Sequence, residues 1–318
     1  MRIVPATATI LDELDRQDMA RRIEICGRLC YKSEDKITAE SAEPFIRKVV
    51  SHGHNSVMEM AALTVRVRCE TEAIIDQFLA ALPKYLQIDR PEKKEKTLLI
   101  SGTVRAFREM YQSWANVKLI KGVTAYLAAR HPLFFFDLGG KRGFLNQTGV
   151  EVEKLSLAEV DALPADLLAR HRHLAVRFIT NRAVTHELVR HRPCSFLQES
   201  QRYCRYSQDK FGNEITFIKP MFFKEGSEEY RLWQQAMLET EKIYLKLLET
   251  VTPQAARTVL PNSCKTEIIV YANLLEWRHI FRLRTTRAAE PSMREVMNPL
   301  LEQMQERFPG LFDGIQGE

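Results

Sequence analysis

Short stretches with strand alternation lead directly into stretches with helical spacing, and this succession constrains the fold more than any other feature of the sequence. Leu174–Ile179 has the pattern of a strand and passes without a linker into a helical pattern at Asn181–Arg190. In the same way, Glu267–Tyr271 precedes a helix predicted over Leu274–Arg284. Leu63–Cys69 alternates as a half-buried strand does. The sequence therefore predicts an α/β arrangement of strands and helices.

Several other segments carry helical or strand patterns, and neither a low-complexity tract nor a long linker separates them. A chain of 318 residues can form one large or two modest domains. Because nothing in the sequence marks a boundary, we predict a single domain over residues 1–318 with a sizeable insertion. Further helices are predicted over Leu11–Cys30, Ala39–Ser51, Glu72–Leu82, Leu157–Arg170, Ser227–Thr250, Gln254–Val259 and Ser292–Arg307, with a short strand at Phe217–Ile218.

Composition and segment length exclude two broad classes of protein. Hydrophobic residues make up 45% and charged residues 27% of the chain, which is ordinary for a globular protein and excludes disorder as the dominant state. No apolar run approaches the roughly 18 residues of a membrane-spanning helix. Residues 1–17 lack the apolar core of a secretory signal, and the six cysteines form no CxxC pair. We therefore expect a cytoplasmic protein with reduced cysteines and no membrane partner.

The basic residues are mostly arginine and fall into two clusters. The formal net charge is only +5, but 29 of the 46 basic residues are arginine. Eight arginines lie between Arg170 and Arg205, and six lie between Arg257 and Arg294. Arginine suits planar, bidentate contact with phosphate or carboxylate. By residue type alone, the densest piece, 189–206, fits a pocket for a phosphorylated small molecule and a basic helix end equally well.

The spacing of several other motifs excludes their usual chemistry. His186 and His191 are five residues apart, so they lie on different helix faces and cannot share a zinc ion as in HExxH; no metal site is expected. GxGxxG, P-loop and GxSxG motifs are absent from the sequence. Phe196, Tyr203 and Tyr206 lie among the arginines, as in nucleic-acid-binding proteins. A small net charge with few lysines favours a binding pocket over an extended surface that follows a nucleic-acid backbone. A nucleic-acid-binding protein therefore remains only as the alternative from a different functional class.

Four motifs, occurring in order over about 230 residues, resemble those of the flavin-dependent thymidylate synthases. The central one is Arg190-His191-Arg192, seven further residues and Ser200, which is the R-H-R-x7-S signature of that family. The others are His52-Gly53-His54-Asn55-Ser56 with Glu59, Arg257 with Leu260-Pro261, and the spacing of Asn273, His279 and Arg284.

The resemblance implies an α+β (α/β) fold, with a central, mainly antiparallel sheet flanked by helices. A large, helical insertion is implied after the first sheet strand, at about residues 70–173. The implied activity is thymidylate synthase: methylation of deoxyuridine monophosphate (dUMP) at C5 to give thymidylate (dTMP). In the family, 5,10-methylenetetrahydrofolate is the one-carbon donor, FAD the redox cofactor and NADPH the reductant. The implied assembly is a homotetramer with active sites at subunit interfaces, and all of these ligands are anionic small molecules that suit arginine-rich pockets.

The matched positions also imply roles for individual residues. Arg284 would be the catalytic residue, stabilising negative charge that develops on the uracil ring. His54 would lie at the folate and flavin edge. The residues implied to contact FAD are Ser56, Arg190, His191, Arg192, Gln198, Asn273 and His279. The residues implied to contact dUMP are Glu187, Arg190, Gln198, Glu199, Ser200, Gln201, Arg202, Arg257 and Arg284.

The sequence departs from the family pattern at three positions, one of which is Met60 in place of a common histidine after Glu59. Glu187 stands where many members have glutamine, so we expect its contact with the nucleotide to use the backbone. Leu275 replaces an arginine that is common two residues after the asparagine at the position of Asn273. The alternative function within the same fold is a flavin-dependent methylase of another pyrimidine nucleotide.

Overall fold

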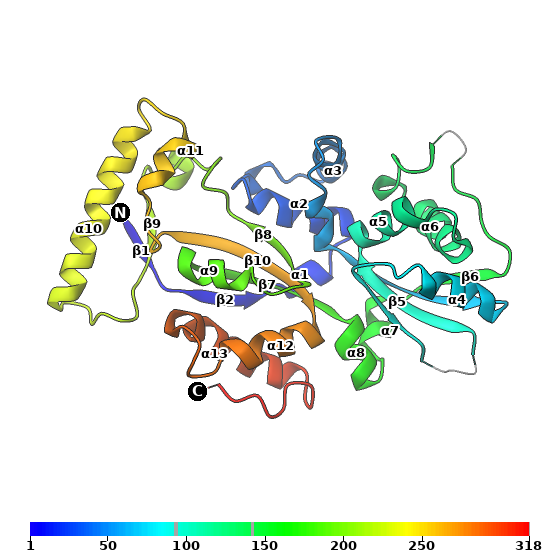
Figure 1. Ribbon diagram of the computed structural model, residues 1–318. Helices are drawn as coiled ribbons and strands as arrows, with labels where there is room; N and C mark the ends of the chain where they lie inside the picture. Colours follow the sequence, from blue (N-terminus) through cyan, green and yellow to red (C-terminus); the bar gives the residue numbers. More distant parts are fainter. Residues whose placement is uncertain (92–94, 141–142, 318) are drawn as a thin grey trace.

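The computed structural model describes residues 1–91, 95–140 and 143–317, and within them the chain forms an α+β fold with two four-stranded antiparallel sheets (Figure 1). In Figure 1 the first sheet lies to the left and the second to the right. This confirms the predicted mixed fold with antiparallel sheets. Among the described helices, none is both long and apolar enough to cross a membrane.

The first sheet has the strand order β2-β7-β10-β8 and carries the arginine-rich motifs at its ends. Alternation along β7 and β10 sends side chains to opposite faces. Val176 and Ile268 pack on one face with α9, α12 and α13, where Trp277 is fully buried. Ile269 and Tyr271 join the core on the other face, which includes residues of α2. The bounds are β2 (Thr7–Ile10), β7 (His173–Asn181), β8 (Ser195–Gln198), β10 (Lys265–Asn273), α2 (Met19–Leu29), α9 (Arg182–Leu188), α12 (Leu274–Arg284) and α13 (Pro291–Arg307).

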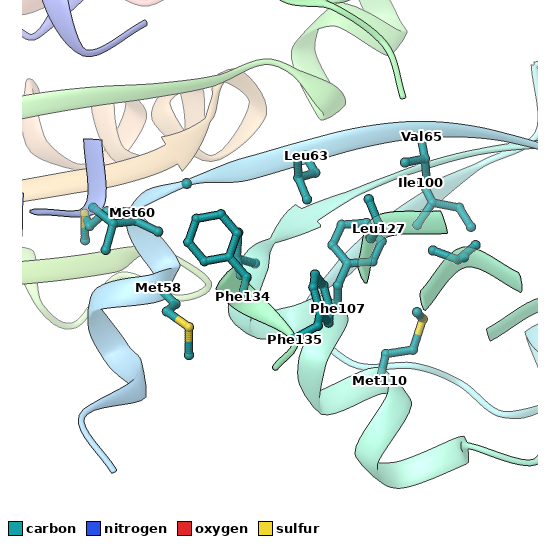
Figure 2. Packing of buried hydrophobic residues seen from close by; sticks show 14 of the residues in the cluster. Met58, Met60, Leu63, Val65, Ile100, Phe107, Met110, Leu127, Phe134 and Phe135 are labelled. Carbon is teal, nitrogen blue, oxygen red and sulfur yellow. The ribbon is translucent and has the colours of Figure 1, made fainter. Parts of the chain in front are cut away.

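The second sheet, with the order β4-β5-β3-β6, is built largely from the predicted insertion. Figure 2 shows Leu63, Val65 and Ile100 of this sheet packed with Phe107 and Leu127 of the covering helices. The bounds are β3 (Ala62–Cys69), β4 (Leu86–Asp89), β5 (Thr97–Thr103), β6 (Val150–Lys154), α4 (Glu72–Ala80), α5 (Val104–Trp114) and α6 (Lys118–Arg130).

Two details of the predicted insertion need correction. It contains the expected helices, but its described part also contributes β4, β5 and β6. The strand predicted over Leu63–Cys69 is present as β3, yet it pairs with β5 and β6 and is not part of the first sheet. The reason is that the partners of β3 lie far along the chain, so local patterns do not specify its sheet.

Two helices predicted as continuous are each divided. The segment 11–30 forms α1 (Asp12–Asp15) and α2, because the Asp18 carboxylate accepts the backbone N–H groups of Ala20 and Arg21 at 2.9 and 3.0 Å and caps a new helix. The segment 157–170 forms α7 (Leu157–Asp161) and α8 (Ala165–His171), which begins after Pro164. Proline has no N–H to continue a preceding helix.

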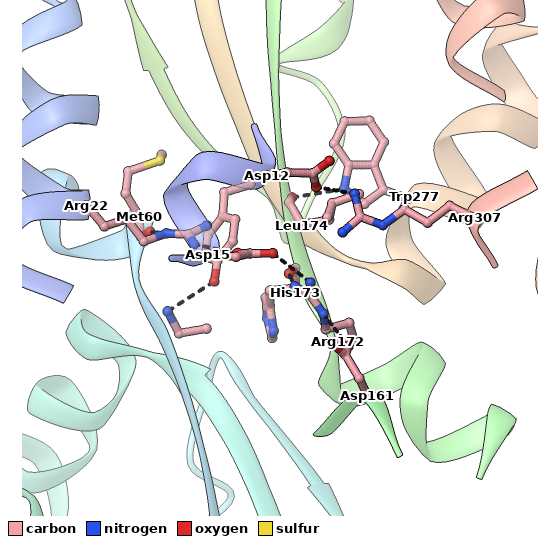
Figure 3. Close-up of polar contacts among 12 residues, drawn as sticks. Asp12, Asp15, Arg22, Met60, Asp161, Arg172, His173, Leu174, Trp277 and Arg307 are labelled. Atoms are coloured by element: carbon pink, nitrogen blue, oxygen red, sulfur yellow. Dashed lines mark hydrogen bonds and ion pairs between the residues drawn. The ribbon is translucent and has the colours of Figure 1, made fainter. Parts of the chain in front are cut away.

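A buried polar junction joins the two sheets (Figure 3). The Asp15 carboxylate binds Arg22 at 2.8 Å and Arg172 at 2.6 Å, and Arg172 also donates to Asp161 at 2.7 Å. Arg22 donates to the carbonyl oxygen of Met60 at 2.6 Å, just before β3. The first helices, the end of α8 and the start of the second sheet are therefore held by one set of charges.

The remaining elements form a third layer at the end of the first sheet. Strand β1 (Arg2–Val4) pairs in parallel with β9 (Thr216–Ile218), and α10 (Glu228–Leu247) packs over them through Tyr230 and Trp233. The short elements are α3 (Ala42–Ser51), α11 (Pro253–Ala256), and the 3-10 turns η1 (Glu34–Lys36), η2 (Asn55–Met60), η3 (Pro132–Phe134), η5 (Asp209–Phe211) and η6 (Arg257–Val259).

Candidate functional site

Arg284, the predicted catalytic residue, is the last residue of α12 and is bound by two residues at the end of α9. Its Nε–H donates to His191 Nε2 at 2.9 Å, and its Nη1 donates to Glu187 Oε2 at 2.5 Å. Nη2 also donates to the backbone carbonyl of Glu187 at 3.3 Å. The guanidinium plane is therefore fixed by three bonds, while 18% of the side chain stays exposed. Both the carboxylate and the backbone carbonyl of Glu187 therefore accept from Arg284, and its contact with the nucleotide stays a prediction.

The charge state of His191 fits this arrangement. Burial is the main cause that lowers the pKa of His191 to about 4. The positive charge of Arg284 and the nearby His279 act in the same direction. The imidazole is therefore neutral near pH 7, and its Nε2 can accept the Arg284 proton donor. The tautomer that this requires carries its hydrogen on Nδ1, an assignment that follows from the donor at Nε2.

Glu276, which is also on α12, lies beside His191 and His279. The ligand atoms of His191, Glu276 and His279 all lie within 4.8 Å of one another, and the His191 and His279 rings meet edge to face at 6.0 Å. Burial raises the pKa of Glu276, and its Oε1 is buried without a hydrogen-bond partner. These three groups could contribute ligands to a metal ion, although His191 Nε2 already accepts from Arg284.

Gln198 and Glu199 send their side chains to opposite faces of the first sheet. Gln198 Nε2 donates to Thr185 at 3.0 Å and Thr266 at 3.2 Å, on the face covered by α9. Glu199 is 3% exposed and accepts from the Tyr206 hydroxyl at 2.9 Å and from Lys265 at 2.8 Å. The Glu199 carboxylate is therefore bound by Tyr206 and Lys265. The Gln198 side chain lies on the opposite face, beside α9.

The loop after β8 places Ser200, Gln201 and Arg202 together. The Ser200 N–H donates to the Cys30 carbonyl at 2.9 Å, and the Ser200 hydroxyl accepts from the Arg202 N–H at 3.3 Å. Gln201 is 8% exposed, and its buried Nε2 has no hydrogen-bond partner. Arg202 is exposed and lies 5.4 Å over the Tyr203 ring. The loop therefore presents a hydroxyl, an unpaired amide donor and a guanidinium, which are groups that bind phosphate.

Charges behind this loop hold it against the end of α2. Glu267 binds Lys32 at 2.7 Å and Lys265 at 2.8 Å, and Lys265 reaches Glu199 in turn. Burial alone would raise the pKa of Glu267, but the two lysines hold it at about 2. Lys210 adds a bond to the Lys32 carbonyl at 2.9 Å. Lys32 and Lys265 thus neutralise Glu199 and Glu267 behind the loop, and Arg202 is an exposed cation of the loop itself.

The residues predicted to contact FAD are mostly exposed. Arg190 and Arg192 lie on the turn after α9, and within the described residues their side chains make no hydrogen bond or ion pair. His54 and Ser56 are exposed at η2, which packs against β8. Asn273 differs, because its side chain caps α12 through the Glu276 N–H at 2.8 Å and donates to the Arg170 carbonyl at 3.0 Å.

One arginine of the first cluster that the motifs do not single out lies near the predicted nucleotide site. Arg182 begins α9, and its N–H donates to the Asn262 carbonyl at 2.9 Å. Burial lowers the pKa of Arg182. Tyr206 opposes this effect, and the nearby positive charge of Arg257 adds to it. The signal available in the sequence was only its place in the arginine cluster. Glu276 was missed as well, although it lies three residues before His279 on α12.

The structure thus joins some predicted site residues and leaves others apart. Arg284, Glu187, His191 and His279 form one cluster. In the part of the chain that the structure describes, no hydrogen bond, ion pair or ring contact joins that cluster to Ser200, Arg202, Ser56 or His54. Among the described residues, no direct contact therefore joins the Arg284 cluster to the other predicted site residues.

Comparison with protein families gives one match over most of the chain. A family model described as thymidylate synthase complementing protein matches residues 10–79 and 167–310. These two stretches contain every residue placed in the clusters above. The segment between them, residues 80–166, supplies β4, β5 and β6 of the second sheet.

Several curated relatives match part of the chain. A flavin-dependent thymidylate synthase of Pyrococcus furiosus is 40% identical over 128 residues, which cover 40% of this chain and 52% of that protein. One of Corynebacterium aurimucosum is 34% identical over 149 residues, covering 42% of this chain and 57% of that protein. The chain thus spans about half the length of the curated relatives it matches.

Proposed function

Because the chain belongs to the thymidylate synthase complementing protein family, we propose that it is a flavin-dependent thymidylate synthase. Its substrate is dUMP, which receives a one-carbon group at C5 from 5,10-methylenetetrahydrofolate, and NADPH is the reductant. Bound FAD supplies the redox chemistry, by carrying reducing equivalents from NADPH to the transferred carbon. The names of the curated relatives, flavin-dependent thymidylate synthases, support this proposal.

The observation that carries the proposal is the fixed guanidinium of Arg284. C5 of uracil is a poor nucleophile until negative charge is placed in the ring, and that charge develops on N3 and O2. A guanidinium does not lose its proton near neutral pH, so Arg284 can stabilise the charge without acting as an acid. His191 and Glu187 hold its plane before substrate binds, which lowers the cost of orienting it.

Several donors of the site suit the two anionic ligands. Arg190 and Arg192 lack polar partners within the described chain, and they would bind the pyrophosphate of FAD, with His191 and His279 beside the flavin. Ser200, Gln201 and Arg202 would bind the dUMP phosphate, together with Arg257. The unpaired Nε2 of Gln201 supports this assignment, because a buried donor without an acceptor costs free energy that a bound phosphate would recover.

We also propose that the active site is completed between subunits of a homotetramer. The support is that the Arg284 cluster, the Ser200 loop and η2 share no direct polar contact among the described residues, so nothing within the described chain joins them into one site. Exposed His54 and Ser56 would then meet the flavin held by a neighbouring subunit.

The test is the reduction of protein-bound flavin. We expect the purified protein to bind FAD, and NADPH to bleach its visible absorption faster under anaerobic conditions when dUMP is present. Deoxycytidine monophosphate is the matched nucleotide control. Failure of the protein to take up FAD contradicts the proposal. A bleaching rate that responds to the cytidine nucleotide and ignores dUMP supports the alternative, a methylase of another pyrimidine nucleotide.

A further inference from the structure

The segment that the family model does not match, residues 80–166, makes a specific contact with the matched part at His171. This residue ends α8, directly before the central strand β7. Its Nδ1 lies 2.7 Å from the hydroxyl of Ser101 on β5, and its Nε2 lies 3.0 Å from the Asp89 carboxylate on β4. The Ser101 hydroxyl also lies 2.7 Å from that of Thr64 on β3. Three neighbouring strands of the second sheet therefore hold one imidazole.

The hydrogen-bond directions of this group are mutually consistent. Burial lowers the pKa of His171 to about 4, against the opposing effect of Asp89, so the ring is neutral near pH 7. A neutral ring facing a carboxylate at Nε2 keeps its hydrogen there, which makes Nδ1 the acceptor for Ser101. Ser101 in turn accepts from Thr64. Each buried hydroxyl then has a partner, while Nε2 approaches the Asp89 carboxylate at 3.0 Å without hydrogen-bond geometry. The two hydroxyl bonds and this close approach fix the position of the ring.

The order serine, histidine, aspartate is also that of a hydrolytic triad, but burial excludes that chemistry here. Ser101 is 0% exposed and His171 is 1% exposed. A nucleophile must reach its substrate, and the Ser101 oxygen is enclosed by Thr64 and His171. The group is therefore a structural contact, and its consequence lies in what His171 is attached to.

The residues on either side of His171 hold the first turn of α12. The carbonyl of Arg170 accepts from the Asn273 side chain at 3.0 Å, and the carbonyl of Arg172 accepts from the Leu274 N–H at 2.9 Å. Asn273 also caps α12 through the Glu276 N–H at 2.8 Å. In Figure 1, α8 accordingly lies beside the start of α12 and next to the second sheet.

We propose that residues 80–166 position α12 for catalysis, and that His171 is the positioning residue through which they act. Asp161 of the same segment binds the Arg172 side chain at 2.7 Å. Residues 80–166 thus contact the side chains of both His171 and Arg172. The backbone carbonyls of Arg170 and Arg172 in turn bind α12. Because α12 carries Glu276, His279 and Arg284, a shift of its first turn changes the groups offered to the flavin. The effect on flavin binding rests on the proposed function, whereas the positioning of α12 does not.

Hydrogen exchange of the full-length protein tests the positioning directly. In Ser101→Ala, the hydroxyl that holds His171 is lost, and we expect the amides of residues 274–277 to exchange about tenfold faster, which corresponds to about 1.4 kcal/mol. Asp89→Asn, a substitution at a partly exposed side chain, is the second variant and is expected to act in the same direction. Tyr126→Phe is the matched control, because it removes a 2.8 Å bond to the Lys154 N–H within the same segment and away from α8.

The functional step is tested by the affinity of the same variants for FAD. We expect Ser101→Ala to bind FAD about tenfold more weakly than the wild type, with Tyr126→Phe unchanged, when both variants have similar midpoints of unfolding. Unchanged exchange at 274–277 in both Ser101→Ala and Asp89→Asn overturns the proposal. Faster exchange with unchanged FAD affinity overturns its catalytic part. Absence of FAD binding by the wild type is a separate result, which contradicts the proposed function and leaves the exchange test intact.

Discussion

The Arg284→Ala variant is expected to form dTMP with a kcat about 10²–10³-fold lower than the wild type while still binding FAD. The loss of this size follows from removing a preorganised positive group at the site where charge develops on uracil. FAD is expected to stay bound, because Arg190 and Arg192, the exposed donors proposed for its pyrophosphate, are unchanged. The measurements are steady-state dTMP formation and flavin absorption of the purified variant.

Two further variants separate this role from a general effect of charge. Arg282→Ala removes an exposed arginine from the same helix and should leave kcat within about twofold, as is usual for surface substitutions. Arg284→Lys keeps the charge but not the planar fork that binds His191 and Glu187 together, so most of the loss should remain. Normal turnover by Arg284→Ala would remove its catalytic assignment.

The Arg172→Ala variant is expected to lose about 3 kcal/mol of the free energy of unfolding, because it breaks a buried ion network from one side. Arg172 is 3% exposed and binds Asp15 at 2.6 Å and Asp161 at 2.7 Å. Without it, Arg22, at 2.8 Å, is the cation that Asp15 retains among the described residues. Urea unfolding measures the effect as a lower midpoint at an unchanged slope.

The control for this prediction lies in the same region of the molecule (Figure 3). Arg307 pairs with Asp12, but the two side chains are 31% and 55% exposed. Exposed pairs of this kind contribute up to about 1 kcal/mol, so Arg307→Ala should shift the midpoint far less. Equal losses in the two variants would contradict the account of the Arg172 junction.

Local patterns identified the two central strands of the first sheet, β7 and β10, and the helix that carries Arg284, but not the edge strands β2 and β8. The helix predicted over Leu274–Arg284 is confirmed with the same bounds, since an asparagine cap precedes a continuous helical pattern. The break between α1 and α2 was not predicted, because the capping role of Asp18 competes with an apolar spacing that runs through it. In the second sheet β4 and β6 were missed. Strand β6 pairs with β3, which is distant in the sequence, whereas β4 pairs with the neighbouring β5 and is a four-residue strand with little pattern of its own.

In the candidate site, too, some residues could be identified from sequence motifs and others only from their tertiary contacts. The motifs identified Arg284, His191 and Glu187, and the structure brings these three together. They did not single out Glu276 or His171. The positions of these two matter through burial and through neighbours on other elements, which a single sequence does not display. The predicted roles of the flavin and nucleotide residues remain proposals.

The release of tritium from dUMP labelled at C5 tests the central claim most directly. Forming the new carbon bond at C5 displaces the hydrogen there, so label should appear in water in step with dTMP. We predict release by the FAD-loaded protein only when NADPH and 5,10-methylenetetrahydrofolate are both present, with one equivalent released per dTMP formed. No release by the FAD-loaded protein with both cosubstrates present would contradict the assignment as a flavin-dependent thymidylate synthase.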